Sequence, residues 1–292
     1  MILPPHQLFS ASSAPTPGTK YPLCHFISYN QYSPSHLCYI ANVSRDEEPL
    51  SYELAMTDPK WQEAMNSELQ AFIDNQTWSL VPLPPGKRLI SCKWVYRIKR
   101  KADMSVERYK ARLVARGFTQ NAGIDYHDTF SPTAKMVTVR CLLAIAASLN
   151  WPLHQFDVNN AFLNGDLLEE IYMSPRPGLR RQGENIVCRL HKSLYGLKQT
   201  SRQWFSKFTK VVLAAGFFRS KADYSLFIKK DGTSLTILLI HVDDILITGN
   251  NIESIKGLKQ FLHTRFRIKD LSDLKFFLGI EIARSKKGIY IS

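Results

Sequence analysis

The sequence predicts an α+β fold in which an antiparallel sheet packs on helices. Some segments repeat apolar residues at the spacing of a helix, and others are short apolar runs joined by turns, as in β-hairpins. The chain has 292 residues, of which 45% are hydrophobic, so it can bury a sizeable core in one or two domains.

The first expected helix opens at Asp58 and Pro59, because proline is favoured at the first helical position. Its apolar residues recur at helical spacing and define one face: Trp61, Met65, Leu69, Phe72 and Ile73. A strand at 78–81 ends at a Pro-Leu-Pro-Pro-Gly run, and a hairpin follows with arms at 91–99 and 107–116.

The remaining elements follow from the same two patterns. Helices are expected at 137–149, 200–214 and 252–266. Strands are expected at 153–158, 171–173, 186–190, 225–229, 235–242 and 245–248, with a last hairpin at 276–284 and 288–291. Residues 1–47 begin with a Ser-, Pro- and Thr-rich stretch and are predicted to form a disordered leader.

Several classes of protein are excluded by composition. No apolar run approaches the roughly 18 residues of a membrane span, so we expect no membrane partner. The first residues have no basic side chain and contain two prolines, which does not fit a signal peptide. Five cysteines without CxxC spacing argue against a disulfide framework or a zinc site.

Positive charge is concentrated in one stretch of the chain. The formal net charge is +13, and residues 81–120 hold eleven bases against two acids. Residues 45–74 have the opposite balance, with eight acids against two bases. Such asymmetry predicts one face for a phosphate backbone, although two solvated basic strands would explain it equally well.

Two acidic sites stand beside apolar strands. Asp157 ends one expected strand, and Asp243 and Asp244 separate two others. Clustered carboxylates repel one another unless a cation joins them, and oxygen ligands without His or Cys favour Mg²⁺. The alternative for the Asp-Asp pair is an ordinary hairpin turn, in which Asp is common.

A set of ordered motifs is similar to the reverse transcriptases of copia-type LTR retrotransposons. The motifs are Lys-Trp-Val-Tyr at 93–96, Arg-Tyr-Lys-Ala-Arg-Leu-Val-Ala-Arg-Gly-Phe at 108–118, Gly-Ile-Asp-Tyr at 123–126, Thr-Phe-Ser-Pro at 129–132, Phe-Asp-Val-Asn-Asn-Ala-Phe-Leu-Asn-Gly at 156–165, Leu-Tyr-Gly-Leu-Lys-Gln at 194–199 and Val-Asp-Asp at 242–244. They occur in the order of the family and cover residues 48–292.

The resemblance implies a right-hand polymerase with fingers at about 77–150 and a palm at about 151–292, cut before the thumb and RNase H domains. It implies an RNA-directed DNA polymerase, part of a polyprotein, that transfers a nucleotide from a dNTP to a primer 3′-hydroxyl. The implied cofactor is Mg²⁺, with Mn²⁺ as an alternative. The implied partners are an RNA or DNA template with its primer and a companion chain that supplies the missing domains. The implied location is intracellular, in a cytoplasmic particle or the nucleus.

The resemblance also assigns roles to individual residues. The catalytic carboxylates would be Asp157, Asp243 and Asp244, and the metal ligands Asp157, Asp243 and the backbone carbonyl near Val158. The contacts to dNTP would be Lys110, Arg112 and Phe162. The contacts to template and primer would be Tyr195, Gly196, Lys198, Gln199 and His241.

Each assignment has a structural alternative. Lys110 and Arg112 share a strand face that could simply be solvated, Phe162 could be a core residue, and Gly196 could belong to a plain turn. His241 replaces the usual Tyr of the family, which puts primer positioning in doubt. The competing hypothesis for the chain is therefore an inactive relic that only binds nucleic acid.

Overall fold

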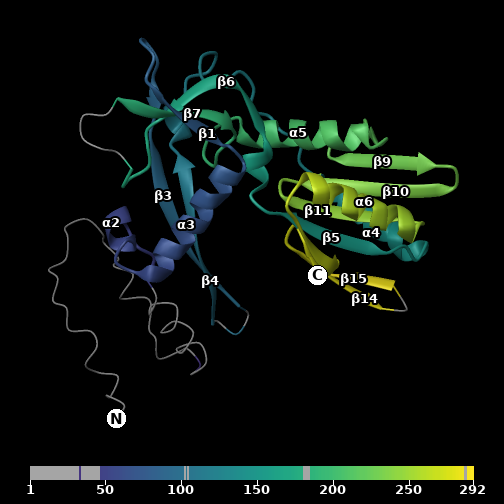
Figure 1. Ribbon diagram of the computed structural model, residues 1–292. Coiled ribbons are helices and arrows are strands. Elements are labelled where there is room, and N and C mark those ends of the chain that lie inside the picture. The colour runs from purple at the N-terminus through teal and green to yellow at the C-terminus, as the bar shows by residue number, and fades with distance from the viewer. Residues whose placement is uncertain (1–32, 34–46, 102, 104, 180–184, 286–287) are drawn as a thin grey trace, which may run out of the picture. The chain divides into compact units, whose positions relative to one another are not determined.

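The computed structural model describes residue 33 and residues 47–101, 103, 105–179, 185–285 and 288–292 (Figure 1). The chain divides into one unit of Met1–Glu48 and Arg100–Glu107 and a second of Pro49–Lys99 and Arg108–Ser292. The predicted leader lies outside the described residues, apart from Ser33 and Glu47. Every side chain of the candidate site belongs to the second unit.

The second unit contains a six-stranded antiparallel sheet (Figure 1). Its strands, in spatial order, are β12 (Ile268–Asp273), β5 (Leu153–Val158), β11 (Asp244–Gly249), β10 (Ser234–His241), β9 (Leu226–Asp231) and β8 (Phe218–Arg219). β5 lies between β11 and β12, so the strand that ends near Asp157 is hydrogen-bonded on both sides.

Both faces of this sheet are covered, because its central strands alternate two apolar sets of side chains. Phe156, Ile240 and Ile245 pack on α5 (Thr200–Ala214) and α6 (Ile252–Arg265). Leu239 and Leu246 pack on α4 (Met136–Ser148) and on the three-stranded sheet of β13 (Phe276–Phe277), β14 (Ile280–Ser285) and β15 (Gly288–Ile291). Burying one such side chain contributes about 1.5–3 kcal/mol, which makes the sheet a firm base for its loops.

A second core joins the remaining elements of this unit. It buries side chains of α3 (Pro59–Asp74), β3 (Cys92–Arg100) and β4 (Val106–Ala115) together with those of β6 (Asp166–Met173) and β7 (Ile186–Lys192). β1 (Trp78–Pro82), β7, β6 and β2 (Leu89–Ile90) form a four-stranded sheet, and β3 pairs with β4. The short elements are α2 (Tyr52–Ala55), η4 (Gly117–Thr119) and η5 (Ala161–Asn164).

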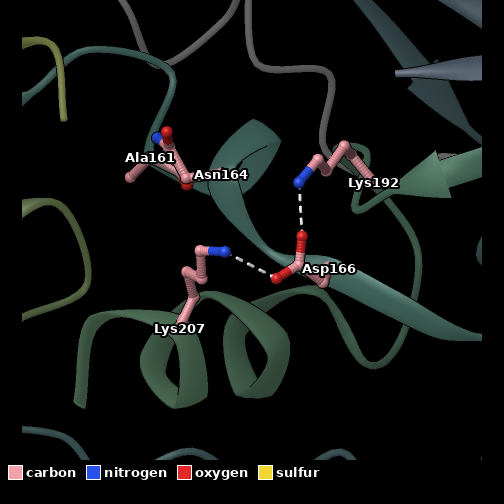
Figure 2. A network of polar contacts seen from close by, with 5 residues as sticks. All are labelled: Ala161, Asn164, Asp166, Lys192 and Lys207. Atoms are coloured by element: carbon pink, nitrogen blue, oxygen red, sulfur yellow. Dashed lines mark hydrogen bonds and ion pairs between the residues drawn. The ribbon is translucent and has the colours of Figure 1, made fainter. Parts of the chain in front are cut away.

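Asp166 fixes the start of β6 directly after η5. Its carboxylate accepts hydrogen bonds from Lys192 of β7 and Lys207 of α5, the latter at 2.8 Å (Figure 2). The Gly165 N–H donates to the Phe162 carbonyl at 3.1 Å. The two lysine bonds connect the start of β6, directly after η5 and Phe162, to β7 and α5.

The predicted helices and most strands are confirmed, but the short elements α2, β2 and β8 were not predicted and four further differences are larger. Ile73 was expected on the buried face of α3 but is 68% exposed, and Glu68 takes the place on that face. β12 was not predicted, because its residues are mostly polar and exposed. β6 begins at Asp166 rather than at 171, and the expected strand 276–284 is two short strands, β13 and β14. Within the described residues, no helix is long and apolar enough to cross a membrane.

Candidate nucleotide site

The β10–β11 hairpin brings Asp243 beside the end of β5. Asp244 pairs directly with Asp157 across β11 and β5, so these two side chains lie on the same face of the sheet. The Val158 N–H donates to the Asp243 carbonyl at 2.9 Å. This bond fixes the turn that carries Asp243 to the strand that carries Asp157.

The turn itself holds strained backbone. Val242 has φ +57°, which is unfavourable for a β-branched residue. The Trp204 indole Nε1–H donates to the Val242 carbonyl at 2.6 Å, and Trp204 is buried in the core between α5 and the sheet. Strain of this kind costs about 1–3 kcal/mol and persists only where the surroundings hold it, as this bond does.

The pKa values of Asp157 and Asp244 are raised. Burial raises the pKa of Asp157, and the charge of Asp243 raises it further, while Lys110 lowers it. Burial also raises the pKa of Asp244, against a hydrogen bond from Gln155 that lowers it. Burial is the largest cause of both shifts and the charge of Asp243 adds to each, so a cation bound here would favour the charged forms.

Only two of the three predicted carboxylates line one cavity. Asp157 and Asp243 do, whereas Asp244 accepts a hydrogen bond from Gln155 Nε2 at 3.3 Å. In the described part of the chain, no three His, Cys, Asp or Glu side chains lie close enough to hold a metal ion. The donor set that fits a hard divalent cation is therefore the Asp157 and Asp243 pair.

The cavity has a volume of about 270 Å³ and joins the acidic turn to the basic strand β4. Its lining includes Lys110, Arg112, Asp157, Val158 and Asp243, five of the residues predicted for metal and dNTP. Ala111 and Leu113 are buried between and beyond the two cations, because alternate residues of a strand face opposite ways. The solvated-face alternative for Lys110 and Arg112 does not fit, since both are half-buried in the cavity wall.

Tyr195 lies between the predicted phosphate-binding and sugar-facing residues. The Arg112 guanidinium lies 4.4 Å from the centre of the Tyr195 ring, and the Phe162 ring meets that ring edge-on at a centroid distance of 5.1 Å. Phe162 is half-buried and packs against the core beneath the sheet, so it combines a core contact with a position next to the cavity.

Gly196 is required by close backbone packing. Its φ is +91°, and a Cβ added there would lie 2.1 Å from the Ala115 carbonyl oxygen. A Cβ added at Gly117 would lie 2.1 Å from the Gly196 carbonyl oxygen. The Tyr195 carbonyl accepts from the Ala115 N–H at 2.8 Å, so the loop before α5 is packed tightly on β4.

Four predicted template or primer residues, Gly196, Lys198, Gln199 and His241, do not line this cavity. Gln199 is fully buried and bonds to Gln120 and to the Asp125 carbonyl. Lys198 is exposed and donates to Tyr126 and to the Gln120 carbonyl. His241 pairs with Asp244 in the hairpin.

Two functional candidates were missing from the prediction. Glu68 of α3 lines the cavity and is 5% exposed, although its residue type does not suggest burial. It follows Trp61 by seven residues and precedes Phe72 by four, so helical periodicity alone places it on the apolar face. The second is Arg108, an exposed residue near the start of β4, which also lines the cavity.

A second cavity, of about 360 Å³, lies between the end of α5, the β9–β10 hairpin and α6. Its lining contains Lys229 and Asp231 but none of the residues predicted for catalysis or nucleotide binding. The candidate site is therefore the smaller cavity, which contains the residues predicted for metal and dNTP.

Comparison with known proteins identifies the family. Residues 75–292 match the model of the family described as reverse transcriptase (RNA-dependent DNA polymerase). Two similar relatives are Retrovirus-related Pol polyproteins of Arabidopsis thaliana: that from transposon RE2 is 44% identical over 87% of this chain and 18% of its own length, and that from transposon RE1 is 43% identical over 86% and 17%. The corresponding polyprotein from transposon TNT 1-94 of Nicotiana tabacum is 41% identical over 84% of this chain and 19% of its own length.

The chain thus spans less than a fifth of the length of these curated relatives. The family match and the three relatives cover most of the described residues, including every predicted site residue. The chain belongs to the reverse transcriptase (RNA-dependent DNA polymerase) family and corresponds to that region of copia-type retrotransposon Pol polyproteins.

Proposed function

We propose that the chain extends a primer on an RNA or DNA template, by transferring a nucleotide from a dNTP to the primer 3′-hydroxyl. The observation that supports this most strongly is the cavity in which Asp157 and Asp243 face Lys110 and Arg112. Carboxylates that can hold a cation and bases that can hold a triphosphate are the two requirements of this reaction.

Each side chain has a defined task in this proposal. Lys110 and Arg112 bind the triphosphate oxygens from one strand face, with Arg112 able to form two parallel hydrogen bonds. Tyr195 supports the Arg112 guanidinium from below, at 4.4 Å. Phe162 lies beside Tyr195 and limits the space available to a 2′-hydroxyl on the incoming sugar.

Asp157 and Asp243 are the residues that would hold Mg²⁺, with the Val158 carbonyl as a further oxygen donor. When bound, the ion would lower the pKa of the primer hydroxyl and neutralise charge on the leaving pyrophosphate. Asp244 would be the third catalytic carboxylate. It pairs with Asp157 across the two strands, and a hydrogen bond from Gln155 orients its side chain. In this assignment β4 and its neighbours are the fingers, and the six-stranded sheet is the palm.

Primer extension by the purified chain tests the proposal. A homopolymer template with a short primer would be extended in Mg²⁺ or Mn²⁺, and Asp243→Asn should reduce incorporation by at least about a hundredfold, because a metal site contributes several kcal/mol to the transition state. Asp231→Asn, at the exposed end of β9, is the matched control and should retain the wild-type rate. Extension by Asp243→Asn at the wild-type rate would refute the site.

A second candidate function is nucleic-acid binding without synthesis. It is favoured by the hydrogen bond that draws Asp244 to Gln155, which leaves only two of the three predicted catalytic carboxylates, Asp157 and Asp243, in the cavity lining. In that case the chain would bind primer–template in low salt but incorporate no nucleotide with either metal ion. Salt-dependent binding that is equal in the wild type and Asp243→Asn, together with no extension, would establish it.

A further inference from the structure

Glu68 is a buried acid that the proposed reaction does not use. It lies on the face of α3 that packs against the core, is 5% exposed and lines the same cavity as Lys110 and Arg112. Its Oε1 atom and the Nε atom of Arg112 are both buried without a hydrogen-bond partner among the described residues. Polar atoms left in this state are rare in native proteins, and they mark places where a further group binds or a charge is held for a purpose.

The charges around Glu68 come from every element of the cavity wall. β4 contributes Arg108, Lys110 and Arg112. Asp157 lines the cavity from the end of β5, Asp243 from the turn between β10 and β11, and Tyr195 from the loop before α5. A carboxylate among three bases partly neutralises the field that would attract a triphosphate.

Burial is the main influence on the protonation state of Glu68. It raises the pKa of Glu68 to about 7, although the charges of Arg112 and Lys110 and the Leu113 N–H lower it. Glu68 is therefore neutral in mildly acidic solution and negatively charged in mildly basic solution. The net positive charge of the cavity wall changes by one over the same range.

We propose that Glu68 is the internal counter-anion of the triphosphate site: its carboxylate balances Lys110 and Arg112 in the empty cavity and limits how tightly the site holds triphosphate and released pyrophosphate. The inference rests on the proposed nucleotide site and adds a positioning residue to it. The electrostatic effect of Arg112 and Lys110 on Glu68 is mutual, so the carboxylate lowers the positive potential that a phosphate meets in the cavity.

Calorimetric binding of inorganic pyrophosphate, without metal ion, tests this directly. Glu68→Gln and Glu68→Met remove the charge, and we expect both to bind pyrophosphate about tenfold more tightly than wild type at about pH 8 and equally at about pH 6. Comparing variant with wild type at each pH cancels the titration of pyrophosphate itself. Glu63→Gln removes a charge from an exposed position of the same helix and should match wild type at both pH values.

The outcomes separate this inference from the proposed function. If Lys110→Ala and Arg112→Ala bind pyrophosphate as wild type does, the nucleotide site itself is wrong. If they lose binding but the Glu68 variants keep one ratio to wild type at both pH values, the counter-anion is refuted.

Should neither Glu68 variant fold, the wild-type protein still decides. Pyrophosphate bound near pH 7 should make the wild-type protein take up protons, because the anion favours neutral Glu68, and the heat of binding would then depend on the buffer. Binding to cations alone makes pyrophosphate release protons, which offsets this uptake, so the titration is repeated with sulfate, which does not titrate near pH 7. No proton uptake on sulfate binding would overturn the proposal.

Discussion

Replacing Glu68 with Gln should make the protein more stable at high pH by removing the cost of burying a charge. The pKa of Glu68 rises from 4.5 to about 7 on folding. At 1.36 kcal/mol for each tenfold change in the ionisation constant, this corresponds to about 3 kcal/mol. The folded state binds a proton that the unfolded state has released, so the stabilisation is present at low pH and is lost as the pH rises through about 7.

The measurement is the free energy of unfolding from urea titrations at about pH 5 and about pH 8. Wild type should lose about 2–3 kcal/mol relative to Glu68→Gln between these values, while the exposed variant Glu63→Gln should follow wild type. A change in hydrogen bonding by the new amide would shift stability equally at both pH values, so the pH-dependent part isolates the charge. A constant difference between Glu68→Gln and wild type would show that Glu68 is already ionised or already paired in the folded state, and the reasoning would fail.

Three further predictions concern the walls of the cavity. Phe162→Val should raise the ratio of ribonucleotide to deoxynucleotide incorporation by about tenfold; a lower melting temperature with an unchanged ratio would instead make Phe162 a core residue. Gly196→Ala should lower the free energy of unfolding in urea titrations by more than about 2 kcal/mol, because the backbone there has φ +91° and the new Cβ would clash with the Ala115 carbonyl. The control is Gly257→Ala, which should be neutral or stabilising because no atom lies within 4 Å of its new Cβ. Trp204→Phe removes the hydrogen bond to the Val242 carbonyl and should lower the rate of incorporation at saturating dNTP more than it changes KM. A change in KM alone would show that the strained turn does not contribute to the catalytic step.

Much of the fold was predictable because its elements have strong local signals. α3 begins at Pro59 as expected, and β10 and β11 have the apolar runs that a doubly covered sheet requires. β12 escaped prediction because it pairs with only one strand and is mostly exposed, so it needs no apolar pattern. Its existence depends on β5, a partner more than a hundred residues away in the chain.

The site was predictable to the extent that its chemistry is local to a motif. Lys110, Arg112, Asp157 and Asp243 lie around one cavity, as the spacing and the family resemblance suggested. Glu68 was missed because a charged residue interrupts the apolar pattern of its helix face and therefore suggests an exposed position. Only the tertiary structure shows which charged residues lie near it.

Burial also separates residues that the motifs group together. Gln199 belongs to the same sequence motif as Tyr195, but its side chain is buried and forms hydrogen bonds with the Gln120 side chain and the Asp125 carbonyl. The sequence alone does not distinguish a side chain that contacts a ligand from one that holds the contacting loop in place.

The packing of Gly117 and Gly196 implies a mechanical constraint on the nucleotide cavity. Backbone contacts on both sides, with a hydrogen bond from Ala115 to the Tyr195 carbonyl, make β4 and the loop before α5 a single rigid part. We therefore expect Arg112 and Tyr195 to move together if the cavity changes width, and the width to change at its other walls, which are α3 and the segments that carry Asp157 and Asp243. For this reason, substitutions on β4 and on the loop before α5 should change the free energy of unfolding in a strongly non-additive way.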